Sequence, residues 1–465
     1  MRHNYLKRPV AIAAFLIAAN IVGFAQTGAK SLIDEKNVRA EMGFLASDAM
    51  QGRGSGTIFE RVTAEYIGSQ FMQFGLEPAG EPGWDGKPTY VQTVTVPGRE
   101  VLASLRITGD PSIEIDYGQA LLALGISTKD VSGPLQKLKA GDKSTKGSVV
   151  LLRVDAEQKF DSLQSILAKL RQDGAVAVLV SETKEARAHW SEIAGQKVSL
   201  SRRSGNIFIL SSQAADSLSK LGDGTNIELT GQFAPGTETR TWNAMGKITG
   251  TDKDLSSEVI LLTSHLDHLG VRETNPGDDK IFNGADDDAS GSTAVMELAR
   301  VFGGGKKPKR TVYFVCFGSE EAGGFGANYF VNNLPFPKDK LIANLEFEMI
   351  GRPDTMVKPD ELWLTGYERS NLGPELAKRG AKLVQDPHPK ENFFQRSDNI
   401  TLARQGIIAH TVSSFGLHTD YHHASDEIKT IDFVHMTRSI NSMVEPIEWL
   451  INSNFKPVWN EGMKP

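Results

Sequence analysis

The sequence predicts an α/β protein, with a three-layer main domain in which a mixed, largely parallel sheet has helices on both faces, and a smaller inserted domain. From residue 241 onward, apolar runs typical of strands alternate with amphipathic stretches typical of helices. Regular alternation of this kind implies a largely parallel sheet covered on both faces. Between residues 101 and 240 the chain changes to short alternating segments rich in Ser, Thr and Gly. That change indicates a separate, β-rich unit.

Residues 1–25 are predicted to be a secretory signal peptide. Arg2, Lys7 and Arg8 precede an apolar run that ends in small residues at Ala25, the order typical of such signals. The alternative is a membrane anchor, but the run is shorter than the roughly 20 residues that a spanning helix needs. We therefore expect an exported protein, periplasmic or extracellular, with no stable membrane span after cleavage.

The charge composition gives no sign of a nucleic-acid partner. The net charge is −6 and the pI is near 6.0, so no broad basic surface is available for nucleic acid. The single cysteine, Cys316, lies in the strand-like run TVYFVCF, where a lone thiol is usually a small buried apolar group. An exported protein without disulfides must depend on its core, helped by any metal that it binds.

The chain divides into three parts after the signal peptide. Residues 26–100 form the N-terminal part of the main domain, and a helical period over 58–74 ends at Gly75, which suits a helix C-terminus. Residues 101–240 form the insert, which contains one strand–helix–strand unit in GSVVLLRV, FDSLQSILAKLRQDG and AVAVLV. Residues 241–465 form the rest of the main domain.

Histidines and carboxylates follow the predicted strands of the main domain. Ligand sites in open α/β sheets form beyond the carboxyl ends of the strands, so we expect these side chains to share one edge. The strands are SEVILLTS, TVYFVCFGS, LIANLEF and GIIAHTVSS, and the residues that follow them are His265 with Asp267, Glu320 with Glu321, Glu348, and His422.

Each of these features, taken alone, can also be explained without a metal or a catalytic role. A His-x-Asp pair is often incidental, NGADDDASG could cap the helix that follows it, and adjacent glutamates in a first helical turn favour the helix dipole. Together, at four strand ends, they predict a metal site. Three carboxylates and two neutral imidazoles carry three negative charges, which suits two divalent ions and one bridging hydroxide. Imidazole and carboxylate ligands without thiolate are typical of hydrolytic zinc sites.

The chain resembles metallopeptidase family 28, the co-catalytic zinc exopeptidases that include leucine aminopeptidases and glutamate carboxypeptidases. The resemblance rests on SHLDHLG, NGADDDASG, GSEEAGGFGA, EFEMIGR and DYHHASDE, which occur in family order. LASDAMQGRGSGT resembles the family's opening segment, and residues 101–240 resemble a divergent protease-associated domain. The resemblance implies the zinc exopeptidase fold and peptide substrates.

The resemblance also implies roles for individual residues. His265, Asp286 and Glu348 would bind one zinc ion, and Asp286, Glu321 and His422 the other; cobalt or manganese could substitute. Glu320 would be the general base, and Asp267 would be the carboxylate behind His265. Two positions depart from the family pattern: Glu348 stands where Asp is usual, and His423-Ala424 replaces a common Thr-Pro.

These residues predict a zinc exopeptidase that removes N-terminal residues from peptides. The same family includes carboxypeptidases and dipeptidases, and Arg352 and Arg396 could clamp a substrate carboxylate. Asp398 and Asp420 could instead receive a protonated α-amine. Less favoured alternatives are a single-zinc glutaminyl cyclase and a non-catalytic binding protein on the same scaffold. The oligomeric state is left open.

Overall fold

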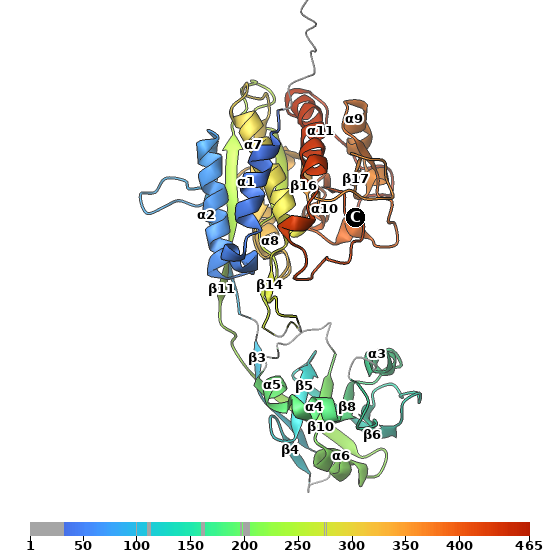
Figure 1. Ribbon diagram of the computed structural model, residues 1–465. Helices are drawn as coiled ribbons and strands as arrows, with labels where there is room; N and C mark the ends of the chain where they lie inside the picture. Colours follow the sequence, from blue (N-terminus) through green and yellow to red (C-terminus); the bar gives the residue numbers. More distant parts are fainter. Residues whose placement is uncertain are drawn as a thin grey trace, which may run out of the picture.

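The computed structural model describes residues 32–465, apart from 99, 109–112, 160–162, 196–197, 199–204, 274 and 276. The predicted signal peptide lies outside the described residues. The chain forms a large domain and a smaller one, joined by two neighbouring strands (Figure 1). No helix within the described ranges has the length and apolar character needed to cross a bilayer.

The large domain is built on a mixed sheet whose central strands are parallel. Its order is β1(Glu77–Pro78), β11(Thr239–Ile248), β15(Thr311–Phe317), β12(Val259–His265), β16(Leu341–Phe347), β19(Ala409–Ser413), β17(Leu362–Leu364) and β18(Leu383–Gln385), and β2(Val91–Val96) also pairs with β11. The parallel strands β15, β12, β16 and β19 are apolar and buried nearly throughout, because helices cover both faces.

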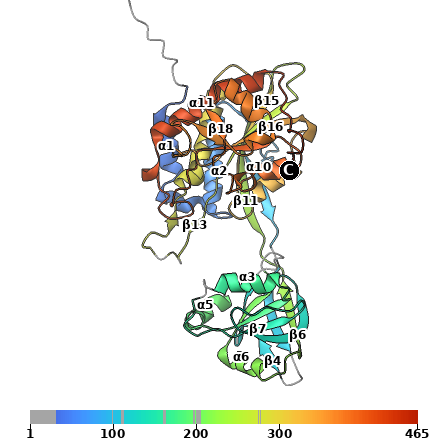
Figure 2. The same ribbon diagram turned by 90° about the vertical axis from the view of Figure 1, so that its right-hand side faces the viewer.

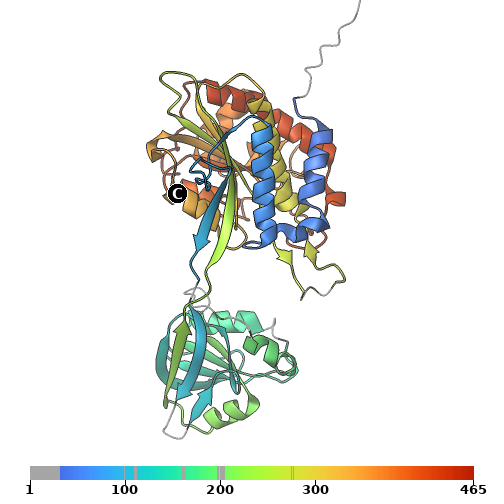
Figure 3. The same ribbon diagram turned by 90° about the vertical axis from the view of Figure 1, so that its left-hand side faces the viewer.

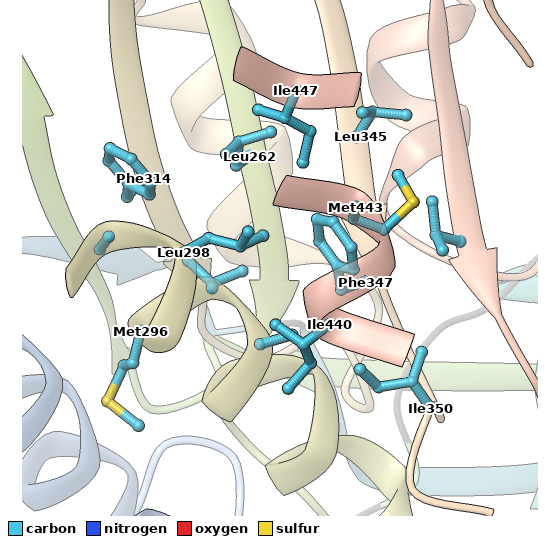
Figure 4. Close-up of a cluster of buried hydrophobic side chains, with 14 of the residues drawn as sticks. Leu262, Met296, Leu298, Phe314, Leu345, Phe347, Ile350, Ile440, Met443 and Ile447 are labelled. Carbon is cyan, nitrogen blue, oxygen red and sulfur yellow. The ribbon is translucent and has the colours of Figure 1, made fainter. Parts of the chain in front are cut away.

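Two helical layers cover this sheet. One face packs against α1(Glu35–Leu45), α2(Ile58–Gln73), α7(Gly291–Gly303), α9(Leu372–Lys378) and α11(Phe433–Asn452), and the other against α8(Phe325–Asn332) and α10(Asn399–Ala403). Figure 4 shows the larger core, in which Leu298 from α7 and Ile447 from α11 pack toward Leu262 and Leu345 of the sheet. The predicted three-layer α/β architecture of the main domain is thus confirmed.

The helix predicted over 58–74 is α2. The Thr57 side chain accepts the backbone N–H of Phe59 and caps its start, and Gly75 follows its end with a φ of 82°. A positive φ at this position suits glycine, because it lacks the Cβ that makes such backbone costly. The helix buries one face against α7 and β11.

The insert has its own sheet and its own core. The strand order is β4(Glu114–Asp116), β3(Val101–Thr108), β10(Asn226–Ala234), β6(Asp130–Leu138), β7(Val149–Leu152), β8(Ala177–Ser181), β9(Ile207–Leu210) and β5(Leu121–Gly125). Strands β6 to β9 are parallel, with helices α3(Gln164–Gln172), α4(Lys184–Ala188), α5(Trp190–Gly195) and α6(Ser212–Ser219). The predicted strand–helix–strand unit is β7–α3–β8. The insert is therefore less purely β than its Ser, Thr and Gly content suggests.

Two antiparallel ladders connect the domains. Strands β2 and β11 pair within the large domain, and their continuations β3 and β10 pair within the insert. Figures 2 and 3 show the two strands leaving the large domain side by side. The short hairpin of β13(Gly270–Val271) and β14(Ile281–Phe282) projects from the large domain on the side that faces the insert (Figure 1).

Candidate metal centre

A first group of donor atoms meets at the carboxyl ends of β12 and β16. His265 is the last residue of β12, Glu348 follows β16, and Asp287 lies in the loop between β14 and α7. His265 Nε2 is 3.2 Å from Asp287 Oδ1 and 4.0 Å from Glu348 Oε1. We call His265, Asp287 and Glu348 the first donor group; their ligand atoms lie close enough together to hold one ion.

A second group lies on the other side of Asp287. His422 Nε2 is 3.2 Å from Asp287 Oδ2 and 3.2 Å from Glu321 Oε1. Asp287, Glu321 and His422 form the second donor group, and His268 Nδ1 lies 2.9 Å from the same Glu321 oxygen. The two oxygens of Asp287 therefore face different groups, which is the arrangement of a carboxylate that bridges two cations.

The structure corrects the predicted bridging residue from Asp286 to Asp287. The Asp286 carboxylate points away from both donor groups and accepts hydrogen bonds from the Gly351 N–H at 2.8 Å and the Ser290 hydroxyl at 3.3 Å. His418 Nε2 lies 2.9 Å from its other oxygen. With these partners, Asp286 joins the loop before α7 to the segment after β16 and cannot also reach His265.

Neighbouring aspartates fix the backbone of this loop. The buried Asp288 carboxylate accepts the N–H groups of His265, Gly291 and Met349. Asp426 accepts the N–H groups of Asp286 and Asp287 from the opposite side. Each acid thus satisfies several backbone donors in a buried site, as buried carboxylates must. The Asp287 side chain is held between the two donor groups by its own backbone.

Asp267 and Glu320 lie beside the first donor group. The Asp267 carboxylate accepts the N–H of Glu320 at 2.9 Å and the hydroxyl of Ser55. It stands 3.7 Å from His265 Nδ1, which is nearer to the backbone carbonyl of Asp267, at 3.2 Å. The predicted role of Asp267 behind His265 is thus shared with its own carbonyl, and its carboxylate positions the backbone of Glu320.

Arg53 connects the end of β12 to the loop that carries Asp287. Its side chain is buried and donates to four carbonyl oxygens, those of Leu45, Leu266, Asn283 and Gly284, at distances from 2.6 to 3.0 Å. Leu266 separates His265 from Asp267, and Gly284 begins the turn that leads to Asp287. One guanidinium therefore sets the spacing between the end of β12 and the aspartate loop.

The donor atoms are buried without the partners that they need. Among the described residues, His265 Nε2 and Glu321 Oε1 make no hydrogen bond of good geometry, although Asp287 Oδ1 and His422 Nε2 lie 3.2 Å away from them, and a buried polar atom left unpaired costs about 1–3 kcal/mol. Burial, together with the charges of Glu346 and Asp287, raises the pKa of Glu348 to about 8. Burial likewise raises the pKa of Glu320, and Asp398 and Glu348 add to this rise. Bound cations would satisfy these atoms and offset the crowding of negative charge.

Left-handed backbone occurs where the site residues join their strands. Ser319, just before Glu320, has a φ of 54°; Met349, just after Glu348, has 51°; and His422 itself has 58°. Such backbone is strained for residues other than glycine and is held by surrounding contacts. These bends turn the side chains of three neighbouring segments toward one point.

A narrow cavity of about 30 Å³ adjoins Glu348. Its walls include Met349, Trp363, Phe393, Phe415 and Tyr421, and Arg396 also lines it. The Tyr421 ring stacks on the His422 ring, with centroids 3.9 Å apart. The cavity thus touches the first donor group at Glu348, and Tyr421 connects its wall to His422 of the second donor group.

The two arginines considered for binding a carboxylate differ in their surroundings. Arg352 Nη1 is 2.7 Å from Asp420 Oδ2, so its charge is already balanced. The Arg396 guanidinium lies over the ring of Phe393, 4.9 Å from its centroid, and 3.6 Å from Glu391. Of these two, Arg396 alone lines the cavity.

Four residues of the centre were absent from the predicted set: Arg53, His268, Asp287 and Asp426. Asp287 stands in a run of three aspartates, and His268 belongs to the motif SHLDHLG that directed attention to His265. Asp426 lies in DYHHASDE, close to His422. Only Arg53 lacked a local signal beyond its place in the opening segment.

Comparison with known proteins shows what the large domain is similar to. Residues 243–445 match the model of peptidase family M28. The "Leupeptin-inactivating enzyme 1" of Streptomyces exfoliatus is 42% identical over 100 residues, covering 21% of this chain and 20% of that protein. An "Aminopeptidase" of Pseudomonas aeruginosa strain UCBPP-PA14 is 33% identical over 120 residues, 25% and 19% of the two chains. These alignments span about a fifth of each relative's length.

Solved structures share the fold. An aminopeptidase from Aneurinibacillus sp. strain AM-1 superposes with a TM-score of 0.55 at 18% identity, covering 93% of this chain and 96% of that one. BSAP, a zinc aminopeptidase from Bacillus subtilis, gives a TM-score of 0.53 at 17% identity, covering 91% and 96%. The strand-end motifs, the geometry that they build and the matched segment agree: residues 243–445, which carry both donor groups, are similar to peptidase family M28.

Proposed function

We propose that this protein is a two-zinc aminopeptidase that removes N-terminal residues from peptides. The observation that carries the proposal is Asp287, whose two carboxylate oxygens each face a separate set of buried donor atoms. The M28 match and the aminopeptidases among the relatives and structural neighbours support the reaction class.

The donor atoms suit zinc. They are imidazole nitrogens and carboxylate oxygens with no thiolate, the ligand set of hydrolytic zinc sites. We assign His265, Asp287 and Glu348 to one ion, and Asp287, Glu321 and His422 to the other. When bound, the two ions supply Lewis-acid activation of a water molecule and of the scissile carbonyl.

Glu320 is the proposed general base. Its backbone is fixed by the Asp267 carboxylate, and Glu320 adjoins the ligand Glu321. Its carboxylate takes a proton from the attacking water and returns it to the leaving amine, a role that contributes about 10²–10⁴-fold to the rate of such reactions.

Tyr421 is the proposed hydrogen-bond donor to the developing oxyanion. It lines the cavity beside Glu348 and stacks on His422. Burial, with the nearby charges of Asp287 and Glu348, raises the pKa of its phenol. The hydroxyl therefore keeps its proton and can donate to the negative charge that grows on the carbonyl oxygen.

Surrounding charge favours recognition of an α-amine. Glu348 and Asp398 crowd the cluster around Glu320, and a protonated amine would be stabilised there. Arg352 and Asp420 pair with each other, which removes one of the two candidate clamps for a carboxylate and one of the two candidate acceptors for an amine, leaving Arg396 and Asp398.

A carboxypeptidase is the second candidate, because Arg396 lines the same cavity. A relative from Arthroderma benhamiae is named "Probable glutamate carboxypeptidase" and is 35% identical over 118 residues, 24% of this chain and 14% of that protein. The positive charge of Arg396 could pair with a substrate carboxylate if it left Glu391.

Export and a role for the insert complete the proposal. The signal-like residues 1–25 indicate delivery to the periplasm or medium. The insert, which resembles a protease-associated domain in sequence, is proposed to shape access to the cleft. The β13–β14 hairpin, which leads into the aspartate loop, points to the insert's side of the large domain (Figure 1).

The test compares Leu-Gly-Gly with its N-acetylated and C-amidated forms on zinc-loaded protein. Acetylation should abolish turnover, because it removes the charged amine, and amidation should change it little. Cleavage of the acetylated peptide with loss of the amidated one would establish the carboxypeptidase instead. Metal analysis of the same preparation should find about two zinc ions per chain.

A further inference from the structure

His268 lies within the centre without any role in the ligand set described so far. Its side chain is fully buried, and neither ring nitrogen makes a hydrogen bond of good geometry with any residue that the structure describes. An imidazole buried in this way forfeits its hydration, and its Nε2 atom gains no partner among those residues in return. Its Nδ1 atom faces the second donor group, 2.9 Å from Glu321 Oε1 and 3.7 Å from Asp287 Oδ2.

The ring is held in this position by its surroundings. Gly284 packs so closely that a Cβ there would lie 2.4 Å from His268 Cγ, and only glycine permits that approach. The ring also meets His422 edge to face, with centroids 5.8 Å apart. His268 is therefore fixed with Nδ1 toward Glu321 and Asp287.

Four donor atoms lie at separations that suit the ligands of one zinc ion. They are His268 Nδ1, Asp287 Oδ2, Glu321 Oε1 and His422 Nε2, and four of their separations are 2.9, 3.7, 3.2 and 3.2 Å. Tetrahedral zinc with ligands at about 2.0–2.2 Å places them roughly 3.3–3.6 Å apart. The observed separations bracket that range.

We propose that His268 is a fourth protein ligand of the second metal position. The inference rests on the proposed two-metal centre and goes beyond its five ligands. The second position then has four protein ligands, the number found in structural zinc sites, and takes water or substrate only as a fifth ligand. The first position, with three, keeps an open place for water or substrate. The two positions consequently differ in affinity, and the second fills first and releases its ion last.

A positioning role is the competing explanation. In that case Nδ1 would donate a hydrogen bond to Glu321, and its loss would weaken metal binding only about 10–100-fold, as for residues that orient ligands. A ligand role predicts a larger loss at one position and a change in the number of nitrogen atoms bound to that ion. Affinity and spectroscopy together separate the two.

The experiment uses the full chain, stripped with a chelator and titrated with zinc against a competing chelating dye. The variants are His268→Gln, His268→Cys and, as a matched control, His423→Ala, which removes an exposed histidine next to His422. Circular dichroism and thermal melting of the stripped proteins check that each variant folds.

The wild type should show two unequal affinities, and His268→Gln should weaken the tighter one by more than about 100-fold while His423→Ala changes neither. Cobalt loaded into His268→Cys should give a thiolate-to-metal absorption band, since a thiolate binds such ions readily. A smaller loss in His268→Gln, or no such band in a folded His268→Cys, would overturn the inference. Binding of fewer than two ions by the wild type would instead refute the proposed function.

Discussion

Replacing Asp287 and Asp286 separately by Asn tests the geometry of the centre most directly. Both changes remove one negative charge from the same loop and nearly preserve shape, so each variant is the other's control. In the structure, only the Asp287 carboxylate lies between the two donor groups. The Asp286 carboxylate instead accepts the Gly351 N–H and contacts His418.

The expected magnitudes differ widely. Unit charges 4 Å apart interact by about 4 kcal/mol at an effective dielectric constant of 20. A bridging carboxylate is closer than this to each divalent ion. Since roughly 1.4 kcal/mol corresponds to a tenfold change in affinity, Asp287→Asn should weaken the binding of each zinc ion by at least about 10³-fold. Asp286→Asn keeps an oxygen for Gly351, so we expect a stability loss of about 1–2 kcal/mol and nearly unchanged metal affinity.

Zinc titration against a chelating dye measures the affinities, and urea unfolding of the stripped proteins measures stability. The expected result is a folded Asp287→Asn protein that retains little zinc and a folded Asp286→Asn protein that retains two ions. If Asp286→Asn lost its zinc while Asp287→Asn kept both ions, the assignment of the bridging residue would be refuted.

Four further predictions concern the general base, the buried arginine, a buried histidine and the insert. Glu320→Gln should keep about two zinc ions while kcat falls by ~10² or more, whereas loss of metal would make Glu320 a ligand. Arg53→Lys cannot donate to all four carbonyls, so urea unfolding should show a loss of about 2–4 kcal/mol, and an unchanged midpoint would contradict this. Burial lowers the pKa of His410 from 6.5 to about 4. As the pH falls, His410 therefore gains a proton in the unfolded chain before it does so in the folded protein, and the free energy of unfolding should fall by roughly 3 kcal/mol between pH 6.5 and 4. Urea unfolding at both pH values should show this loss in the wild type and should not show it in His410→Gln. Replacing the insert by an Asn-Gly turn after Val96, which pairs with Thr239, should keep zinc but alter which peptide lengths are cleaved; unchanged length preference would remove the insert from substrate access.

The main sheet was predictable because its signals are local. The apolar runs that became β12 and β15 carry their own periodicity, and parallel strands bring their carboxyl ends to one edge. His265, Glu321, Glu348 and His422 therefore came together in the structure at the expected edge.

Which of the three neighbouring aspartates faces both donor groups could not be predicted from the local sequence. Asp286, Asp287 and Asp288 have the same side chain, and their directions depend on an irregular turn whose backbone is held by Asp426 and Arg53. Those partners lie far away in the sequence, so the family resemblance, carried over by position, assigned the bridge to Asp286 although the oxygens of Asp287 are the ones that face both donor groups.

The insert illustrates a different limit. Its content of Ser, Thr and Gly indicated strands, but composition does not report whether neighbouring strands are parallel. The β6 to β9 segment is parallel because its connections are long enough to cross over the sheet. That property depends on which strands become neighbours, which a single sequence does not state.

The paired strands that join the domains also bear on how the chain folds. Pairing of β2 with β11 in the large domain requires residues 96 and 239 to meet across about 140 residues of chain, a loop closure whose length-dependent entropic cost is about 4 kcal/mol. Once the insert has folded, its β3–β10 ladder already holds the two exit points together, and the remaining gap is only a few residues. The folded insert then holds β2 and β11 close together, in position to pair in the main sheet. A mutation that unfolds the insert would therefore slow folding of the large domain.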